Sequence, residues 1–147
     1  MASASPQLAF DQGGHEVVLH ARSNARASAA NGLTTGVAGI MIGDLSSAAE
    51  TRSIAEQVNA IGRIDAVIHN AGIYLEPVRG DIAEGHAKTL AVNTLAPYML
   101  TALIKRPARL VYLSSGMHLG GSASLDDIDW NIRRWNSTAP IPKACSM

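Results

Sequence analysis

The sequence contains a single cysteine, Cys145, and no histidine stands at metal-ligand spacing from it. A lone cysteine cannot form an internal disulfide, and a structural zinc site needs several ligands at short, regular spacing. The sequence therefore predicts neither a disulfide framework nor a metal site. A reducing, intracellular setting fits this usage best, and we expect the protein in the cytoplasm.

The chain also has a formal net charge of zero, because 12 basic residues are balanced by 12 acidic ones. Proteins that bind nucleic acid or anionic membranes through their charge carry an excess of lysine and arginine. We therefore expect no nucleic acid and no polyanionic partner for this chain.

The sequence shows no targeting or membrane-spanning segment. Residues 1–10 have neither a basic start nor a long apolar core, so they do not resemble a secretory signal. The most apolar helical stretch, residues 90–104, is too short to span a bilayer and is interrupted by Asn93 and Pro97. At 147 residues, the chain has the length expected of one domain.

Short apolar runs alternate with helical patterns along the chain. Strands are predicted within residues 15–23, ending before Arg22, and at residues 39–44, 64–70 and 109–114; helices are predicted at residues 24–31, 47–61 and 81–106. Strands that alternate with helices pair in parallel through right-handed crossovers. The sequence therefore predicts an α/β fold built on a doubly wound parallel sheet whose strands are buried on both faces.

Two of the predicted helices begin with the spacing of a capping box. These boxes are Ser-Ala-Ala-Glu at residues 47–50 and Asp-Ile-Ala-Glu at residues 81–84. Ile54, Val58 and Ile61 follow the first box at the spacing of one helical face, which predicts an amphipathic helix. The second box is predicted to open a long helical region.

Small and polar residues follow each of the predicted strands. They are Arg22, the pair Asp44-Leu45, the tripeptide Asn70-Ala71-Gly72, and the pair Ser114-Ser115. Ligands of parallel α/β sheets bind beyond the carboxyl ends of the strands. Taken singly, each group has an ordinary reading as a turn, or as a carboxylate favoured near a helix start. As an ordered set, they predict one ligand site.

Together with the run Val-Asn-Thr-Leu-Ala-Pro-Tyr at residues 92–98, this ordered set resembles the short-chain dehydrogenase/reductase family. The resemblance covers roughly residues 11–135, and the run at residues 114–130 resembles the retinol-dehydrogenase-like subset of the family. It implies a Rossmann-like fold and an NAD(P)-dependent oxidoreductase that acts on a small carbonyl or alcohol substrate. One departure is His69-Asn70, where the family usually has two asparagines.

The resemblance also implies roles for individual residues. In the family, the Asn-Ala-Gly loop closes over the adenosine part of a nicotinamide cofactor, and Asp44 resembles the residue that meets the adenine ring. Asn93 belongs to the catalytic set, and Ser115 resembles the serine that hydrogen-bonds the substrate carbonyl. The implied cofactor-binding residues are therefore Arg22, Asp44, Leu45, Asn70, Ala71 and Gly72, and the implied catalytic residues are Asn93 and Ser115.

Arg22 bears on which cofactor is used. A carboxylate after this strand pairs with the ribose hydroxyls of NAD, whereas an arginine can neutralise the 2′-phosphate of NADP. No acidic residue follows Arg22 closely, so the sequence favours NADP over NAD. A solvated surface arginine is the alternative.

The glycine-rich turn that opens the family fold is not found. Its backbone amides hold the cofactor pyrophosphate after a first strand, but only fourteen residues precede His15, and a strand-helix-strand unit takes about 30. The glycine-containing run at residues 35–40 precedes a predicted strand instead of following one, so we reject it as the phosphate loop. On the resemblance, residues 8–12 would end the first helix; alternatively, residues 8–10 form a hairpin with residues 15–19.

The reactive Tyr-x-x-x-Lys pair is not found either, although the family uses its lysine to lower the pKa of the tyrosine for proton transfer. The residues four positions after Tyr74, Tyr98 and Tyr112 are Val78, Ala102 and Gly116, and the residue four before Lys143 is Ala139. We interpret residues 1–136 as a partial NAD(P)-binding Rossmann domain, incomplete at both ends, and residues 137–147 as an irregular tail foreign to the family. We expect impaired cofactor binding and no catalysis.

A non-catalytic α/β interaction or regulatory module, derived from such an enzyme, is the alternative function. The sequence leaves open the substrate and whether the protein forms an oligomer.

Overall fold

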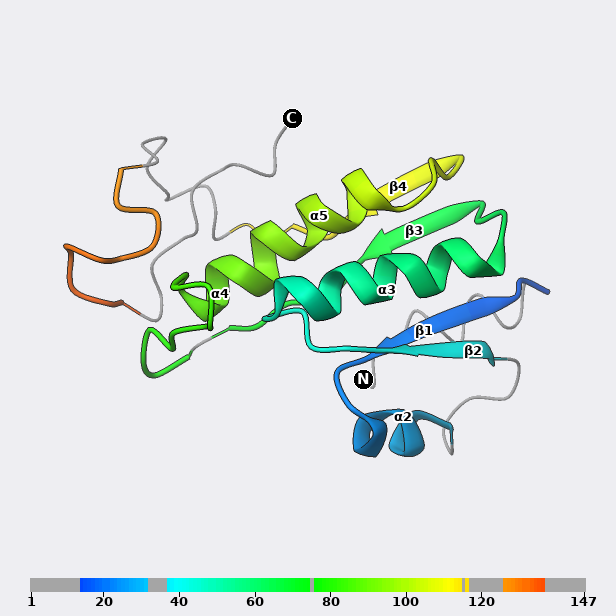
Figure 1. Cartoon of the computed structure of the whole chain (residues 1–147), viewed down its shortest axis with the longest axis horizontal. Coiled ribbons are helices and arrows are strands. Elements are labelled where there is room, and N and C mark those ends of the chain that lie inside the picture. Colours follow the sequence, from blue (N-terminus) through cyan, green and yellow to red (C-terminus); the bar gives the residue numbers. More distant parts are fainter. Residues whose placement is uncertain (1–13, 32–36, 75, 115, 117–125, 137–147) are drawn as a thin grey trace. The chain divides into compact units, whose positions relative to one another are not determined.

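The computed structural model describes residues 14–31, 37–74, 76–114, 116 and 126–136 (Figure 1). Their elements are β1 (Val17–Ala21), α2 (Asn24–Asn31), β2 (Val37–Ile42), α3 (Ala48–Ile61), β3 (Ala66–His69), α4 (Lys88–Leu90), the π-helix η1 (Ala91–Leu95), α5 (Ala96–Leu103) and β4 (Arg109–Tyr112). The chain divides into two compact units, residues 1–44 and residues 45–147.

Unit 1 is a parallel strand pair with one helix. Strands β1 and β2 are hydrogen-bonded in parallel, with Val17 opposite Val37 and Ala21 opposite Ile42, and α2 packs on both strands. The predicted helix at residues 24–31 is confirmed. The second strand begins two residues earlier than predicted and ends at Ile42 instead of Asp44, so residues 37–40 belong to β2 itself.

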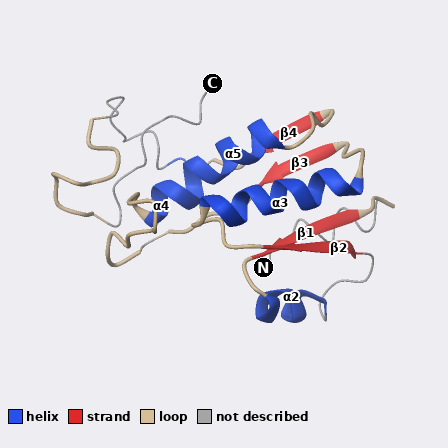
Figure 2. Ribbon diagram, in the orientation of Figure 1, coloured by secondary structure: helices blue, strands red, loops and turns tan. Residues whose placement is uncertain are grey.

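Unit 2 repeats this arrangement with longer helices (Figure 2). Strands β3 and β4 pair in parallel, and α3 packs against α5. The predicted cap of α3 is confirmed, since Ser47 Oγ accepts a 3.3 Å hydrogen bond from Glu50 N. The α3 helix ends at Gly62, whose φ of 105° suits a residue without a Cβ. Asn59 joins the helices by bonding Leu103 O at 2.9 Å and Lys105 N at 2.7 Å.

The strand order confirms the predicted parallel α/β fold, which the structure shows in part. Among the described residues, the four strands form two separate two-stranded parallel sheets, β1-β2 and β3-β4. Each strand therefore has one edge without a strand neighbour in the described part of the chain. Unpaired strand edges leave backbone donors and acceptors to solvent or to another segment.

The predicted helix start at residues 81–84 is wrong. The helix begins at Lys88, and Asp81 instead forms an antiparallel bridge with Ala87. The two acidic side chains of the apparent capping box bind elsewhere: Asp81 pairs with Arg79, and Glu84 Oε1 accepts a 2.9 Å hydrogen bond from Ala48 N. A neighbouring arginine and a backbone amide 36 residues away have thus replaced the local cap.

The predicted burial of the strands on both faces is also wrong. In unit 1, most residues of β1 and β2 are half-buried, and His20 and Ala38 are exposed. Burial is lower still in unit 2. All four residues of β4 are exposed, and Val111 retains 43% of its surface. The apolar pattern predicts strand formation, but burial on both faces also needs a covering layer on each side. Within the described part of unit 2, only α3 and the α4–α5 helix supply such a layer. Ile61, predicted on the buried face of α3, is likewise exposed.

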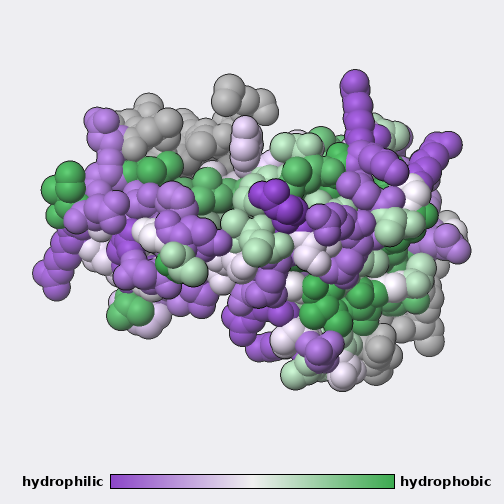
Figure 3. All heavy atoms as spheres, viewed as in Figure 1, coloured by the Kyte–Doolittle hydropathy of each residue, from purple (hydrophilic) through white to green (hydrophobic). Residues whose placement is uncertain are grey.

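The core of unit 2 lies between its helices. Its buried apolar side chains come from α3, from the α4–α5 helix and from residues directly after it, and they include Ile54, Ala55, Leu90, Ala96, Leu100 and Ile104. Figure 3 shows hydrophobic residues at the visible surface among many hydrophilic ones. None of the described helices is long and apolar enough to cross a membrane.

Candidate functional site

The side chain of Asn93 holds the backbone just after the Asn-Ala-Gly loop. Its Oδ1 accepts a 2.9 Å hydrogen bond from Ile73 N, and its Nδ2 donates a 2.9 Å hydrogen bond to Ile73 O. Both halves of the amide are therefore used on one residue. This contact, which we call the Asn93 clip, fixes the chain at the point where it leaves residues 70–72.

The π-helix η1 determines where Asn93 points. In an α-helix, the N–H of residue 97 would donate to the carbonyl of Asn93, four residues earlier. Pro97 has no backbone N–H, so it cannot make this bond. The helix widens over Ala91–Leu95, and Ala96 N bonds Ala91 O, five residues back. Single π-turns of this kind are frequent at functional sites. The proline predicted as an interruption therefore marks the position of the Asn93 clip.

The loop held by this clip is open to a ligand. Asn70, Ala71 and Gly72 are all exposed, and they follow the carboxyl end of β3. A Cβ added at Gly72 would lie 3.5 Å from Asn93 Oδ1, which is ordinary van der Waals contact. The small size of these residues thus leaves the backbone accessible from outside, as a flat ligand requires.

Ser114 lies at the same end of the sheet as this loop. Leu113 N donates a 3.1 Å hydrogen bond to His69 O, which keeps the ends of β3 and β4 together. Ser114 follows directly and is exposed. Ser115, the predicted partner of the substrate carbonyl, lies outside the described residues, so its role remains a prediction.

His69, which replaces the usual asparagine, belongs to a polar network between β3, β4 and α5. Thr101 Oγ1 lies 3.1 Å from His69 Nε2 and 2.5 Å from Tyr112 Oη, and it donates a 2.8 Å hydrogen bond to Pro97 O. Because the hydroxyl has one proton, His69 and Tyr112 must both donate to it. This assigns the proton of the neutral imidazole to Nε2. The two rings also stack at 4.8 Å between centroids.

Burial lowers the pKa of His69 below its usual value of 6.5. The unfolded state then binds more protons than the folded state as the pH falls through 6.5, so the free energy of unfolding decreases on acidification. We expect the urea midpoint, followed by circular dichroism, to be lower at about pH 5 than at about pH 8.

The matched variant for this expectation is His69→Gln, which keeps a donor to Thr101 but cannot titrate. Its midpoint should change less between the two pH values than that of the unaltered chain. An equal pH dependence in both proteins would show that His69 is not the titrating group.

The remaining predicted cofactor residues lie at the corresponding end of the β1-β2 pair. Arg22 is exposed and follows β1 directly, whereas Asp44 is partly buried two residues after β2. The strand ends are joined by Gly43 N, which bonds Ala21 O at 3.1 Å, and by His20 Nε2, which lies 2.8 Å from Gly43 O. The structure thus brings Arg22 and Asp44 to one end of the unit 1 pair.

Leu45 is different, because its side chain is buried with 8% of its surface exposed. It begins unit 2, two residues before Ser47, the N-cap of α3. A cofactor contact at Leu45 remains a prediction.

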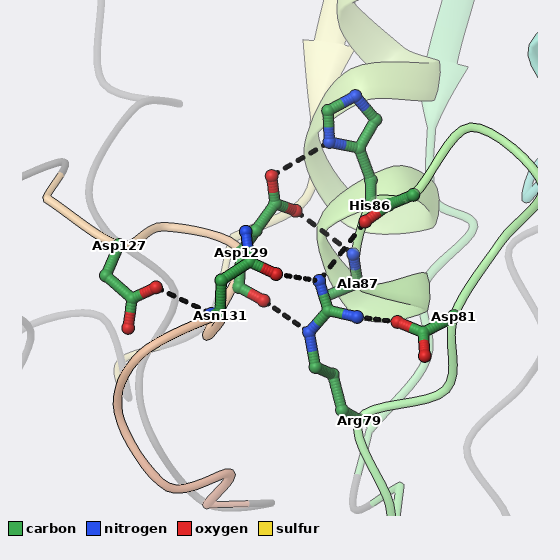
Figure 4. Close-up of polar contacts among 8 residues, drawn as sticks. Arg79, Asp81, His86, Ala87, Asp127, Asp129 and Asn131 are labelled. Carbon is green, nitrogen blue, oxygen red and sulfur yellow. Dashed lines mark hydrogen bonds and ion pairs between the residues drawn. The ribbon is translucent and has the colours of Figure 1, made fainter.

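A second cluster of polar side chains joins residues 79–87 to residues 126–136 (Figure 4). The sequence patterns did not reveal it. Asp129 and Arg79 are its centre, with side chains 17% and 18% exposed. Asp129 bonds His86 and Ala87, while Arg79 reaches the backbone of Asp129 and the side chain of Asn131. Asp129 was visible in the sequence, but His86 and Ala87, which its carboxylate contacts, lie more than forty residues away.

Residues 126–136 are also folded internally. The carboxylate of Asp127 accepts hydrogen bonds from the backbone N–H groups of Asn131, Ile132 and Arg133, and these bonds lower its pKa. Trp130 is buried and meets Trp135 edge to face at 5.2 Å, and Trp135 Nε1 donates to Glu76 O at 3.0 Å. Residues 126–136 therefore form an ordered loop attached to residues 76–87.

Within the described residues, no group of three or more His, Cys, Asp or Glu side chains could hold a metal ion. The polar groups that remain at the strand ends are amides, hydroxyls, one arginine and one carboxylate. Such a set suits an organic ligand with ribose, phosphate or amide groups.

Comparison with known proteins gives consistent matches. The family model described as enoyl-(acyl carrier protein) reductase matches residues 7–120. An uncharacterized oxidoreductase of Emericella nidulans is 49% identical over 131 residues, which cover 87% of this chain and 51% of the relative. Retinol dehydrogenase 13 of Homo sapiens is 31% identical over 103 residues, covering 65% of this chain and 31% of that protein. This chain thus spans about half the length of its fungal relative.

A solved structure matches as well. A short-chain dehydrogenase from Sphingobium yanoikuyae in complex with NADPH superimposes with a TM-score of 0.61 at 25% identity. The match covers 76% of this chain and 48% of that one. It confirms the predicted Rossmann-like arrangement for the part of the chain that it covers.

Proposed function

Since this chain belongs to the short-chain dehydrogenase/reductase family, we propose that it carries part of the NADP(H) site of an oxidoreductase that acts on a small carbonyl or alcohol compound. The observation that carries the proposal is the Asn93 clip, because it holds the exposed Asn-Ala-Gly loop at the carboxyl end of β3. The complex of the Sphingobium yanoikuyae dehydrogenase with NADPH supports the same cofactor class.

The described residues fit parts of this cofactor. Arg22 is an exposed cation at a strand end and suits the 2′-phosphate of NADP. Asp44 can accept hydrogen bonds from the adenine ring, and the open backbone of residues 70–72 suits the adenosine part. When bound, the nicotinamide supplies or accepts a hydride.

The chain's own residues would position the substrate. Ser115 can donate a hydrogen bond to a substrate carbonyl and so stabilise charge that develops on its oxygen. Both polar groups of the Asn93 side chain bond the backbone of Ile73, so in this proposal Asn93 is a positioning residue for the loop. Neither residue readily gives up a proton at neutral pH.

Cofactor preference provides the test. Attaching a family-type first strand, glycine-rich turn and helix ahead of residue 11 should give a polypeptide that binds NADPH more tightly than NADH. Arg22→Ala should weaken NADPH binding by roughly tenfold to a hundredfold and leave NADH binding unchanged, because a charged bond to phosphate is lost. Isothermal titration calorimetry with both cofactors measures this difference.

Arg26→Ala is the matched control, since Arg26 is an exposed arginine on the adjacent helix α2 and its loss changes the net charge equally. It should leave the preference intact. Equal effects of the two substitutions on NADPH, or a preference for NADH before any substitution, would contradict the assignment of Arg22.

A non-catalytic α/β module is the second candidate function. The observation that favours it is the lack of a Tyr-x-x-x-Lys pair in the 147 residues. It predicts that restoring the glycine-rich turn and the Tyr-x-x-x-Lys pair yields cofactor binding without turnover.

A further inference from the structure

The ordered loop at residues 126–136 caps the helix that carries Asn93. Asp129 Oδ1 accepts a 3.0 Å hydrogen bond from Ala87 N, and Asp129 Oδ2 lies 2.8 Å from His86 Nδ1 (Figure 4). Ala87 is the N-cap residue of α4, is fully buried and has no side-chain oxygen with which to cap the helix. A carboxylate at this end is favoured by the orphan amides and by the helix dipole. Asp129 thus provides a cap from 42 residues away.

Arg79 binds the backbone of the residue that carries this carboxylate. Its Nε donates a 2.5 Å hydrogen bond to Asp129 O, and one of its terminal nitrogens donates to Asn131 Oδ1 at 2.9 Å and to Gly85 O at 3.2 Å. The planar guanidinium has donors in fixed directions, so one side chain connects both loops rigidly. The pair Arg79–Asp81 anchors its other end.

The ordered loop also contains two residues in the left-handed backbone region, Asp127 at a φ of 51° and Trp130 at a φ of 53°. A bulky residue such as tryptophan rarely adopts this conformation, and it persists only where its surroundings enforce it. Burial of Trp130 and the contacts of Asp127 provide that enforcement. The loop is therefore built to present Asp129 in one geometry.

The helix capped by Asp129 leads directly to the Asn93 clip. It runs without a break from Lys88 through η1, which carries Asn93, and the Asn93 side chain bonds both backbone groups of Ile73. We infer that Asp129 is a positioning residue for the Asn-Ala-Gly loop and acts through Ala87, the helix and Asn93. The role of that loop in cofactor binding belongs to the proposed function, whereas the path from Asp129 to Ile73 rests on these contacts alone.

Amide hydrogen exchange of the full chain tests this path without any cofactor. In Asp129→Ala, exchange should become about tenfold faster or more at Ala87 and at Ile73, since each loses an ordered acceptor. The amides of Leu113 and Thr51, which bond His69 O and Ser47 O, should keep their rates. A merely structural loss of stability would accelerate all four amides together.

Two variants serve as controls. Asp129→Asn keeps a side-chain oxygen for Ala87 and should hold the Ile73 rate within about twofold of the unaltered chain. Asp65→Ala removes an exposed carboxylate paired with Arg63 and should change neither Ala87 nor Ile73. Unchanged rates at Ala87 and Ile73 in Asp129→Ala, or faster exchange at Ile73 in Asp129→Asn, would overturn the inference.

A measurement on the unaltered chain covers the case in which Asp129→Ala does not fold. Exchange at increasing, sub-denaturing urea should give Ala87 and Ile73 the same opening free energy, and tryptophan emission should follow that opening, since both tryptophans of the chain are in the ordered loop. Separate opening of Ile73 would overturn the inference. Failure to bind NADPH would instead count against the proposed function and leave these exchange rates as they are.

Discussion

No NADPH-dependent reduction of retinal-like or other aldehydes is expected from a polypeptide of these 147 residues. The tyrosine that would act as the proton donor is missing from its family position, and removing such an acid typically lowers the rate by about 10² to 10⁴. The lysine that activates it and the glycine-rich bed for the pyrophosphate are not found in the sequence either. Absorbance at the nicotinamide wavelength, followed with excess aldehyde, measures the rate.

Restoring these parts should restore the chemistry. A polypeptide with the family's first strand and glycine-rich turn, and with a Tyr-x-x-x-Lys segment in place of the residues after Asn136, is expected to turn over. In that background, Ser115→Ala should lower kcat by roughly 10² to 10³, the usual effect of removing one donor to a developing oxyanion. Ser114→Ala is the matched control, because Ser114 is the exposed neighbour at the end of β4.

Two results would show that the wrong chemistry has been assigned. One is measurable turnover by the unmodified polypeptide, since its sequence offers no activated tyrosine. The other is a restored polypeptide that is indifferent to Ser115 but sensitive to Ser114. A restored polypeptide that binds NADPH without turnover would favour the non-catalytic module.

Elements with local signals could be predicted from the sequence. The helix α3 carries its own cap at Ser47 and its own stop at Gly62, and both are present in the structure. The parallel pairing of the strands also followed from the alternation of strands and helices. In these cases the determining residues lie within a few positions of the element that they define.

Elements with distant partners could not be predicted. The spacing of Asp81 and Glu84 matched a capping box, but Glu84 binds the backbone N–H of Ala48, 36 residues away, and the helix starts later. Likewise, the carboxylate that caps the helix comes from Asp129, and no local pattern pairs it with Ala87. A periodic pattern encodes the shape of a segment, whereas these contacts depend on which loops the fold brings together.

The candidate site shows the same division. The Asn-Ala-Gly loop was predicted as a ligand loop because it follows an apolar strand, and its residues are exposed at the end of β3. That Asn93 would hold Ile73 by both backbone groups could not be predicted, since it depends on the π-turn before Pro97. The roles of Arg22, Asp44, Leu45 and Ser115 remain predictions.

Weak binding of NADP(H), or none, is expected for the unmodified polypeptide of 147 residues. The cofactor pyrophosphate carries two negative charges, which the family holds with backbone amides at a helix start. Two charged hydrogen bonds of about 2 kcal/mol each correspond to roughly a thousandfold in the dissociation constant. Arg22 cannot replace those donors, because it is a single exposed side chain placed for the 2′-phosphate in the proposed site.

Calorimetric titration measures this directly against the polypeptide with the glycine-rich turn restored, which should bind at least about a thousandfold more tightly. Gly72→Trp in the restored polypeptide is the informative variant, because its bulk would cover the loop that the Asn93 clip holds open, so binding should fall again. Gly39→Ala is the control: it lies within β2, its added Cβ would meet Met41 Cε at an ordinary 3.9 Å, and it should leave the affinity unchanged. Micromolar binding of NADPH by the unmodified polypeptide would contradict the expectation, because the Asn-Ala-Gly loop and Arg22 would then suffice without amides for the pyrophosphate.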